Sequence, residues 1–135
     1  MEKTAKQIEK DVFRIIKSSA LNGNIKGKFY RDGTRPKNAD TEDVVVKFLS
    51  GVDGQEQSGV VLIHIYVPNV PAKDGETIED IPRIDHLENL LNQVVSEIND
   101  TEYLFEKDGT PQSYPVEGIS QHFINMRLYY RRKTF

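Results

Sequence analysis

The sequence predicts an α+β protein with two layers: a mostly antiparallel sheet of four to five strands, two main helices packed on one face, and a long protruding hairpin. Three observations predict this class. Apolar residues recur at helical spacing in two segments, and they alternate at strand spacing in several others. The order helix, strand, hairpin, helix, strand, strand also lacks the regular strand-helix alternation of a parallel sheet. With 135 residues, the chain fits a single domain, residues 1–135.

The first helix is predicted from Ala5 to about Leu21. Apolar residues recur there in steps of three and four while most charged residues fall between them, which is typical of an amphipathic helix. Asn22 and Gly23 tolerate the left-handed conformation that often ends a helix. A short strand from Lys26 to Arg31 and a polar loop to Thr41 are expected next.

A long antiparallel hairpin is predicted from two segments rich in β-branched residues, Glu42 to Ser50 and Gly59 to Val67. Each arm of about nine residues would be about 30 Å long. Residues 51–58 between them are polar and rich in turn formers, so we expect a protruding tip. Pro68 ends the second arm because it cannot donate to a ladder.

Residues 68–80 are expected to form a connector that leads to the second helix. Asp80 is the predicted N-cap, and Pro82 suits the first turn. The helix should end at Asn99. Its apolar stripe contains Ile84, Leu87, Leu91, Val94 and Ile98.

The C-terminal part is expected to contain a short strand, a loop and a long final strand. Tyr103 to Lys107 is the short strand, and Thr110 to Gly118 is the loop. The final strand runs from Ser120 to about Arg132 with one buried and one polar face. The residues of the buried face are His122, Ile124, Met126, Leu128 and Tyr130.

Charge is sorted along the chain. Residues 1–37 carry a net charge of +6, residues 38–119 carry −13, and residues 120–135 carry +4. A formal net charge of −3 therefore conceals basic ends around an acidic middle. This pattern favours a protein that contacts copies of itself, because opposite charges on different surfaces guide association.

The residue types argue against several chemistries. Without cysteine there is no thiolate zinc site and no cysteine nucleophile. His64, His86 and His122 fall on separate predicted elements without metal-ligand spacing, and no phosphate-binding loop follows a strand. We therefore expect no enzyme activity, no metal and no cofactor. A hydrolase or metal enzyme built on residues 68–80 and 108–119 is the least favoured alternative.

Membrane insertion is not expected. The longest strongly apolar run, Val60 to Val67, is far too short to span a bilayer. The N-terminal residues are charged and lack the apolar core of a secretory signal. We expect the chain to be cytosolic when made.

The basic C-terminal segment, Arg127 to Lys133, is the best candidate for nucleic-acid binding because aromatic residues are interleaved with cations. A sequence pI near 5.6 and the acidic middle argue against a broad basic footprint. A polar sheet face with a basic end is therefore the favoured interpretation, and nucleic acid is an unlikely partner.

Several runs of the sequence resemble a known family. These runs are Gly27-Lys28-Phe29-Tyr30, Arg31-Asp32-Gly33-Thr34-Arg35-Pro36 and Glu42-Asp43-Val44-Val45-Val46. The run from Val61 to Pro68, the leucine-rich helix and the long final strand extend the likeness. The chain is similar to the tail completion, or tail terminator, proteins of bacteriophages and prophages, of the minor tail protein type. The likeness covers nearly the whole chain and lies in the order and spacing of elements.

This resemblance implies a non-enzymatic structural protein that caps or completes the tail tube as a ring, commonly a hexamer, and mediates joining to the head connector. The implied partners are further copies of the chain, the tail tube protein and the head-tail connector protein. The implied location is the host cytoplasm during assembly and then the virion tail. A head-to-tail connector or neck component is the alternative in the same class, and a nucleic-acid-binding module using the basic C-terminal strand is an alternative from another class.

Charge provides the candidate interface residues. A closed ring uses heterologous contacts, in which one patch meets a different patch on the next subunit. We expect the basic residues Arg31, Arg35 and Lys37 to face acids across the subunit boundary. The candidate acids are Asp53, Glu56, Asp74 and Glu76.

Overall fold

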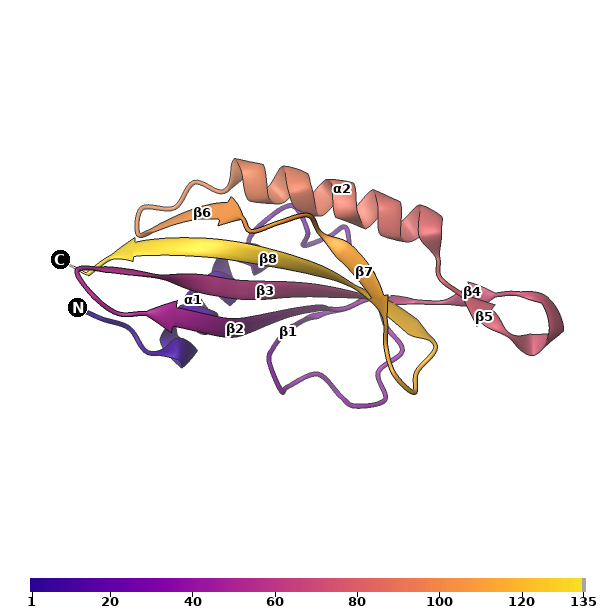
Figure 1. The fold of residues 1–135 in the computed structure, drawn as a ribbon. Coiled ribbons are helices and arrows are strands. Elements are labelled where there is room, and N and C mark those ends of the chain that lie inside the picture. Colours follow the sequence, from indigo (N-terminus) through magenta and orange to yellow (C-terminus); the bar gives the residue numbers. More distant parts are fainter. Residues whose placement is uncertain (135) are drawn as a thin grey trace.

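The computed structural model describes residues 1–134 and shows an α+β fold with two helices and a mixed sheet of six strands (Figure 1). A separate two-stranded hairpin extends from one end. In chain order, the elements are α1 (Ala5–Lys17), β1 (Phe29–Arg31), β2 (Val44–Val52), β3 (Glu56–Pro68), β4 (Val70–Pro71), the 3-10 turn η1 (Lys73–Gly75), β5 (Thr77–Ile78), α2 (Ile81–Glu97), β6 (Tyr103–Lys107), β7 (Gln112–Pro115) and β8 (Gln121–Lys133).

The sheet has the strand order β1-β2-β3-β8-β6, and β7 also pairs with β8. Within residues 1–134, only β1 is parallel to its neighbour, and the other pairs of this sheet are antiparallel. Strands β6 and β7 follow one another along the same edge of β8, because Tyr103–Lys107 pair with its C-terminal half and Gln112–Pro115 with its N-terminal half. The prediction of four to five strands is therefore wrong. It missed β7, which lies inside the expected loop at residues 110–118.

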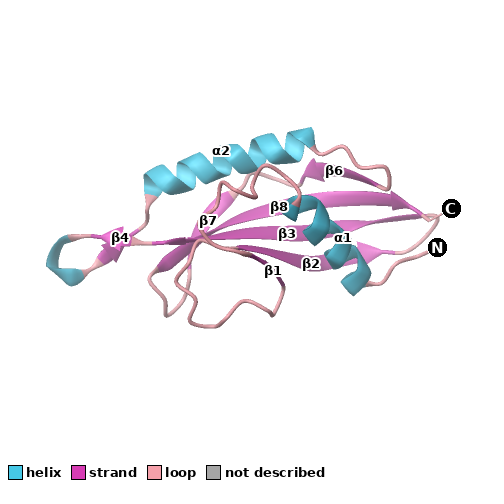
Figure 2. Ribbon diagram, turned by 180° about the vertical axis from the view of Figure 1, so that it is seen from behind, coloured by secondary structure: helices cyan, strands magenta, loops and turns pink. Residues whose placement is uncertain are grey.

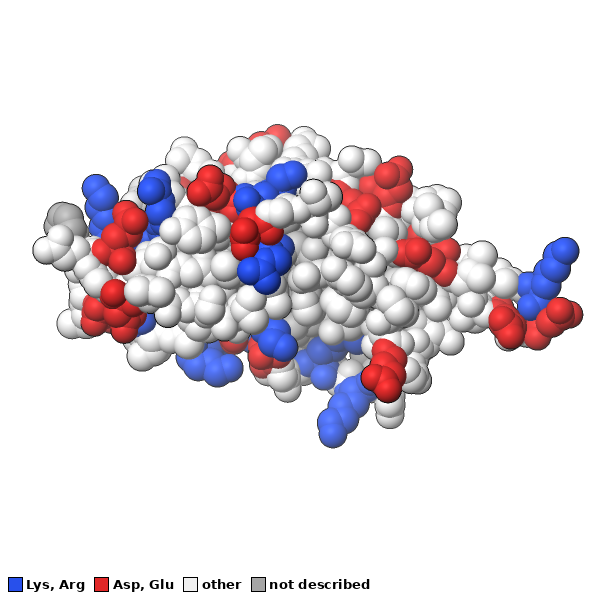
Figure 3. Space-filling view, viewed as in Figure 1, with Lys and Arg blue, Asp and Glu red and all other residues white. Residues whose placement is uncertain are grey.

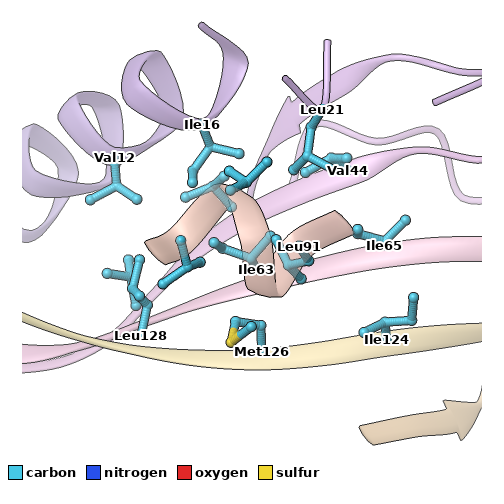
Figure 4. Packing of buried hydrophobic residues seen from close by; sticks show 14 of the residues in the cluster. Val12, Ile16, Leu21, Val44, Ile63, Ile65, Leu91, Ile124, Met126 and Leu128 are labelled. Carbon is cyan, nitrogen blue, oxygen red and sulfur yellow. The ribbon is translucent and has the colours of Figure 1, made fainter. Parts of the chain in front are cut away.

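Both helices contribute to one hydrophobic core on the same face of the sheet (Figure 2). Ile8, Val12 and Ile16 of α1 and Leu91 of α2 are at most 2% exposed. Alternate residues of β2, β3 and β8 meet them, including Val44, Ile63, Ile65, Ile124, Met126 and Leu128 (Figure 4). Each fully buried side chain of this size stabilises the fold by about 1.5–3 kcal/mol.

The helix termini follow the local sequence. Thr4 and Gln7 form a capping box at the start of α1. The N-terminus of α2 is capped as predicted, since the Asp80 carboxylate accepts a hydrogen bond from the Arg83 N–H. Helix α1 ends at Lys17 rather than near Leu21, and β1 begins at Phe29 rather than Lys26.

The long hairpin is an antiparallel pair, but its tip does not protrude as predicted. The strands continue to Val52 and from Glu56, which leaves three residues in the turn. The N–H of Thr134 donates to the carbonyl oxygen of Gln55 at 3.0 Å, and the Gln57 amide is bonded to the backbone of Lys3. Both chain ends therefore hold this turn against the body (Figure 1).

The protruding hairpin is instead the segment that the sequence suggested was a connector. Strands β4 and β5 pair through Val70 with Ile78 and Pro71 with Thr77. The turn between them contains Asp74 at φ 61° and Gly75 at φ 75°. Two consecutive positive φ angles suit the tight turn of a two-stranded hairpin. We call residues 69–80 the arm.

Candidate interaction surface

The sheet face opposite the helices is uncovered among residues 1–134, and Figure 1 views it directly. Because side chains alternate along a strand, the residues between the core positions point to this open face. On β3 they are mostly apolar or aromatic. The polar face predicted for the final strand is found in part, because Asn125, Arg127 and Arg131 alternate there with the core positions. The apolar and aromatic residues of the open face include Leu62, His64, Tyr66, Phe123, Tyr129, Leu104 and Tyr114, and its charged residues include Lys47 and Glu106.

An aromatic cluster occupies the part of the open face nearest the arm. The Phe123 ring centroid lies 4.7 Å from that of His64, 5.8 Å from that of Tyr66 and 5.7 Å from that of Tyr114. The guanidinium carbon of Arg35 lies 4.0 Å from the Tyr66 ring centroid, within cation-π range. Rings from three strands therefore form a continuous surface.

The histidine of the aromatic cluster is uncharged at neutral pH. His64 is partly buried, and its Nε2 lies 3.0 Å from Asn125 Oδ1. Burial lowers the pKa of His64, outweighing the opposite effect of the Asn125 contact, so the imidazole is neutral at pH 7. Figure 3 shows a broad uncharged surface over the sheet, with one group of mixed charge and further charges toward the edges and ends. Arg127 and Asp108 pair at 3.0 Å on this side.

Large apolar side chains are exposed on or beside this face. Leu104 is 60% exposed, Leu49 44% and Tyr114 40%. Single exposed apolar residues need no explanation, but a contiguous apolar patch with a charged rim marks interaction sites. On the open face, exposed apolar side chains lie beside the aromatic cluster, with Lys47 and Arg127 among them.

The arm is a second exposed feature. Residues 69–80 carry four acids and one lysine, and Asp74 and Glu76 at the tip are exposed without an ion-pair partner among residues 1–134. Ile78 is 56% exposed on the shaft, and Ile81 is 65% exposed where α2 begins. The arm thus combines an apolar shaft with an acidic tip.

A basic cleft lies beside strand β1. Its volume is about 630 Å³, and it is lined by residues 26–28, Tyr30, residues 36–41 and Asp43. Lys26, Lys28 and Lys37 are exposed on its rim, and none forms an ion pair within the part of the chain that the structure describes. Apolar lining comes from Tyr30, Pro36 and Ala39. We call this feature the basic cleft.

Two of the predicted interface cations have partners within the chain. Arg31 Nε donates to Glu9 Oε1 at 2.9 Å, and Glu9 is 2% exposed. Arg35 Nε donates to Asp43 Oδ2 at 2.9 Å, and Asp43 is fully buried. Only Lys37 of the three predicted cations is left to attract an outside acid.

The predicted interface acids are divided between two ends of the molecule. Asp53 and Glu56 lie at the hairpin turn near the chain termini, where Asp53 accepts a hydrogen bond from the Gln57 amide at 2.7 Å. Asp74 and Glu76 lie on the arm at the other end (Figure 1). The structure therefore does not bring these seven residues together within one subunit.

The buried ion pair between Arg35 and Asp43 fixes the loop that lines the basic cleft. Burial by itself would raise the pKa of Asp43, but hydrogen bonds from the Thr41 hydroxyl, the Lys28 N–H and Arg35 lower it below its usual value. The same Arg35 contacts the carbonyl oxygens of Ala39 and Thr41. The loop between β1 and β2 is thus tied to the sheet.

The C-terminal basic segment is largely used inside the fold. Arg132 is 8% exposed and donates to Glu102, to Gln57 Oε1 at 2.9 Å and to the carbonyl oxygen of Met1 at 2.8 Å. Arg127 is paired with Asp108. Arg131 and Lys133 are exposed and have no ion pair among residues 1–134, which reduces the cationic footprint available to a nucleic acid.

The three histidines lie on different elements and have different surroundings. His64 contacts Asn125, His122 Nδ1 lies 2.8 Å from Asn69 Oδ1, and His86 is exposed on α2. Within residues 1–134, no three histidine, aspartate or glutamate side chains are grouped to hold a metal ion. No helix in the same residues is both long enough and apolar enough to cross a bilayer.

No protein-family model matches the chain, and no curated protein matches it significantly.

Sequence reasoning missed the open aromatic face, although a signal was present. In the segment from Val60 to Val67 both alternating sets are apolar or aromatic, since Leu62, His64 and Tyr66 interleave with the core positions. A strand with one solvent face would show polar residues there. The pattern predicts a strand with two faces to cover.

Proposed function

We propose that this protein is a non-enzymatic structural subunit that assembles into a ring through the open sheet face. The observation that carries the proposal is the large aromatic and aliphatic share of the sheet face that neither helix covers among residues 1–134 (Figure 3). Its few charged groups include Lys47 and the Arg127–Asp108 pair. Aromatic residues are enriched in protein interfaces because they bury a large area at low entropic cost.

The size of the face is sufficient for a stable contact. Its four strand positions hold 13 residues of β3, 13 of β8, nine of β2, and five of β6 followed by four of β7. At about 3.3 Å per residue and about 4.8 Å between strands, the face covers about 700 Å². A standard stable interface buries about 800 Å² on each partner. That is also about a tenth of the accessible surface of 8019 Å².

The kind of assembly that we propose comes from the sequence resemblance. A ring that caps or completes a phage or prophage tail tube, and joins it to the head connector, requires a small protein with several interaction surfaces. The chain offers at least three: the open face, the arm and the basic cleft. Its partners would be its own copies, the tail tube protein and the connector protein. Its place would be the host cytoplasm and then the virion tail.

The test of self-assembly uses Leu62→Glu. Leu62 lies in the middle of the open face, opposite Lys47 on β2 and Arg127 on β8. A glutamate there finds cationic neighbours in the free subunit, so the fold should be retained. In an assembled interface this carboxylate and its cationic neighbours would be buried together, and taking charges out of water costs several kcal/mol per ion, which pairing repays only when its geometry is excellent.

We expect the wild-type protein to elute as an oligomer in size-exclusion chromatography with light scattering, and Leu62→Glu to lower its mass toward that of one chain. Asn22→Glu is the matched control, because it adds the same charge at an exposed site after α1. A variant mass equal to that of the wild type would contradict the role of the open face.

The partner is tested by co-purification. The wild-type ring should retain a phage tail tube protein, and Leu62→Glu should not. Retention of only the portal-side connector protein would favour the neck component instead.

A further inference from the structure

The geometry points to a second, electrostatic contact between subunits, in which the acidic arm of one copy inserts into the basic cleft of the next copy. This inference deepens the proposed function and rests on its premise of self-assembly. It keeps Lys37, Asp74 and Glu76 of the charge pairing expected from sequence. Arg31 and Arg35 are left out because the structure assigns them to partners within the chain.

The arm is shaped to reach another molecule. It extends beyond the end of the sheet and the start of α2 (Figures 1 and 2). Its tip is held by two backbone hydrogen bonds, from Ala72 N–H to Glu76 O at 2.8 Å and from Glu76 N–H to Lys73 O at 3.2 Å. Asp74 keeps a left-handed conformation, which is unusual for a residue other than glycine. A hairpin with this defined tip loses less entropy on binding than a free loop would.

The charges of arm and cleft are complementary. The arm presents Asp74 and Glu76 at its tip, and the cleft presents Lys26, Lys28 and Lys37 against the single exposed acid Asp40. These groups lack ion-pair partners among residues 1–134, so a contact between copies would not break pairs that the subunit already has. Complementary charges of this kind set orientation and accelerate association.

The apolar parts are complementary as well. On the shaft of the arm, next to the acidic tip, the exposed residue Ile78 pairs with Val70. In the cleft, Tyr30, Pro36 and Ala39 provide apolar lining beside the lysines. Insertion of the arm would bury the apolar side chains of the arm against those of the cleft, and this burial is favourable in proportion to the apolar area removed from water.

The cleft also adjoins an unpaired strand edge. Among the described residues, β1 pairs only with β2, so no further strand lies along its outer edge. At the C-terminal end of this edge, the carbonyl oxygen of Arg31 accepts from Thr34. Tyr30 and Lys28, on and just before β1, line the cleft. Within residues 1–134, the two short strands of the arm pair only with each other, and an exposed edge can pair when an extended segment joins a sheet.

One arm and one cleft on each subunit define a heterologous contact. Each copy donates its arm to one neighbour and receives the arm of the other. Contacts of this kind close into rings when the rotation between subunits permits it.

The first test is disulfide crosslinking, for which a chain without cysteine is well suited. Glu76→Cys combined with Lys37→Cys should give, on mild oxidation, a ladder of linked chains in non-reducing gels. The highest band should report the number of subunits in the ring. Glu76→Cys combined with Asn22→Cys is the control and should remain a single band. A pattern no different from the control, or a disulfide formed within one chain, would overturn the inference.

The second test is charge exchange. The arm variant carries Asp74→Asn and Glu76→Lys, where asparagine is chosen because it tolerates the left-handed conformation at position 74. The cleft variant carries Lys28→Glu and Lys37→Glu. Each variant alone should assemble at least tenfold more weakly than the wild type. An equimolar mixture should recover assembly, because each basic arm then meets an acidic cleft and each acidic arm meets a basic one. Lys10→Glu with Lys17→Glu, at exposed positions of α1, is the control for net charge.

The outcomes separate this contact from the open face. If Leu62→Glu abolishes assembly while the arm and cleft variants assemble like the wild type, the arm contact is refuted and the proposed function stands. If the two charge variants fail alone and recover when mixed while Leu62→Glu assembles normally, the arm contact stands and the role of the open face is refuted. A wild-type protein that is monomeric and gives no crosslinked ladder refutes both.

Discussion

Replacing Asp43 with alanine should destabilise the protein by about 4 kcal/mol. Its carboxylate is fully buried and accepts three hydrogen bonds: 2.8 Å from the Lys28 N–H, 2.9 Å from Arg35 Nε and 2.6 Å from the Thr41 hydroxyl. Asp43→Ala leaves the Arg35 cation, whose side chain is 10% exposed, without its counter-ion. Removing one partner of a buried ion pair costs about 3–5 kcal/mol.

This loss is large compared with the whole stability of a domain, which is about 5–15 kcal/mol. For a chain of this size, it corresponds to a Tm lower by about 12–20 °C. Urea unfolding followed by circular dichroism at 222 nm measures the free energy directly. A loss below about 1 kcal/mol would refute the assignment of Asp43 as the anchor of the loop between β1 and β2.

A double-mutant cycle isolates the ion pair. Arg35→Met removes the charge but keeps most of the side-chain length, and the Asp43→Ala/Arg35→Met double variant should be more stable than the sum of the two single losses predicts. Groups in direct contact typically give coupling energies of about 0.5–3 kcal/mol. Additive losses would show that the two side chains do not act as a pair.

The stabilisation that Asp43 provides should also depend on pH. Because the pKa of Asp43 is lowered in the folded protein, its contribution is fully present above the unfolded pKa of about 3.9 and is lost as the pH falls through the folded pKa. The difference in unfolding free energy between wild type and Asp43→Ala should therefore be constant from pH 5 to 7 and shrink below pH 4. A difference that grows on acidification would contradict the lowered pKa.

Three further substitutions test the fold. Gly59→Ala should lower the free energy of unfolding by more than about 2 kcal/mol, because the added Cβ would lie 2.1 Å from the backbone oxygen of Ser50 on the paired strand. An unchanged free energy in urea unfolding would contradict the close approach of β2 and β3. Tyr103→Phe removes the hydroxyl that donates to Asp11 at 2.7 Å, so the free energy of unfolding should fall by about 1–2 kcal/mol. An unchanged Tm would show that this hydrogen bond does not stabilise the fold. Leu128→Ala should lower the free energy of unfolding by about 2–5 kcal/mol, since the side chain is fully buried between the sheet and the helices. A smaller loss in chemical denaturation would indicate that the core collapses around the cavity.

Local patterns predicted the regular elements well where the signal was long and periodic. The second helix, its Asp80 cap and the alternation of the final strand are confirmed by the structure. Strand β7 was missed because its four residues include a proline and stand between turn formers, so no period of two is visible. Pairing with β8, a partner adjacent in space, is what makes it a strand.

For the predicted interface residues, too, the sequence gives only part of what the fold shows. Charge sorting predicted that Arg31, Arg35 and Lys37 would act alike, because sequence records only the sign and position of a charge. In the fold, Arg31 and Arg35 reach the buried carboxylates of Glu9 and Asp43. Lys37 has no such partner among residues 1–134, and its position on the cleft follows from the path of the loop.

By itself, the sequence determined the two helices, the long strands and most of the side chains that enter the core, because these properties depend on the spacing of neighbours along the chain. The tertiary structure decided that residues 1–134 form a six-stranded sheet that includes β7, that residues 69–80 project as an arm, and that one sheet face has no helix over it. It also decided which charges are neutralised inside the subunit and which remain to attract another molecule. Pairing and coverage depend on residues far apart in sequence, and only folding brings those residues within contact distance.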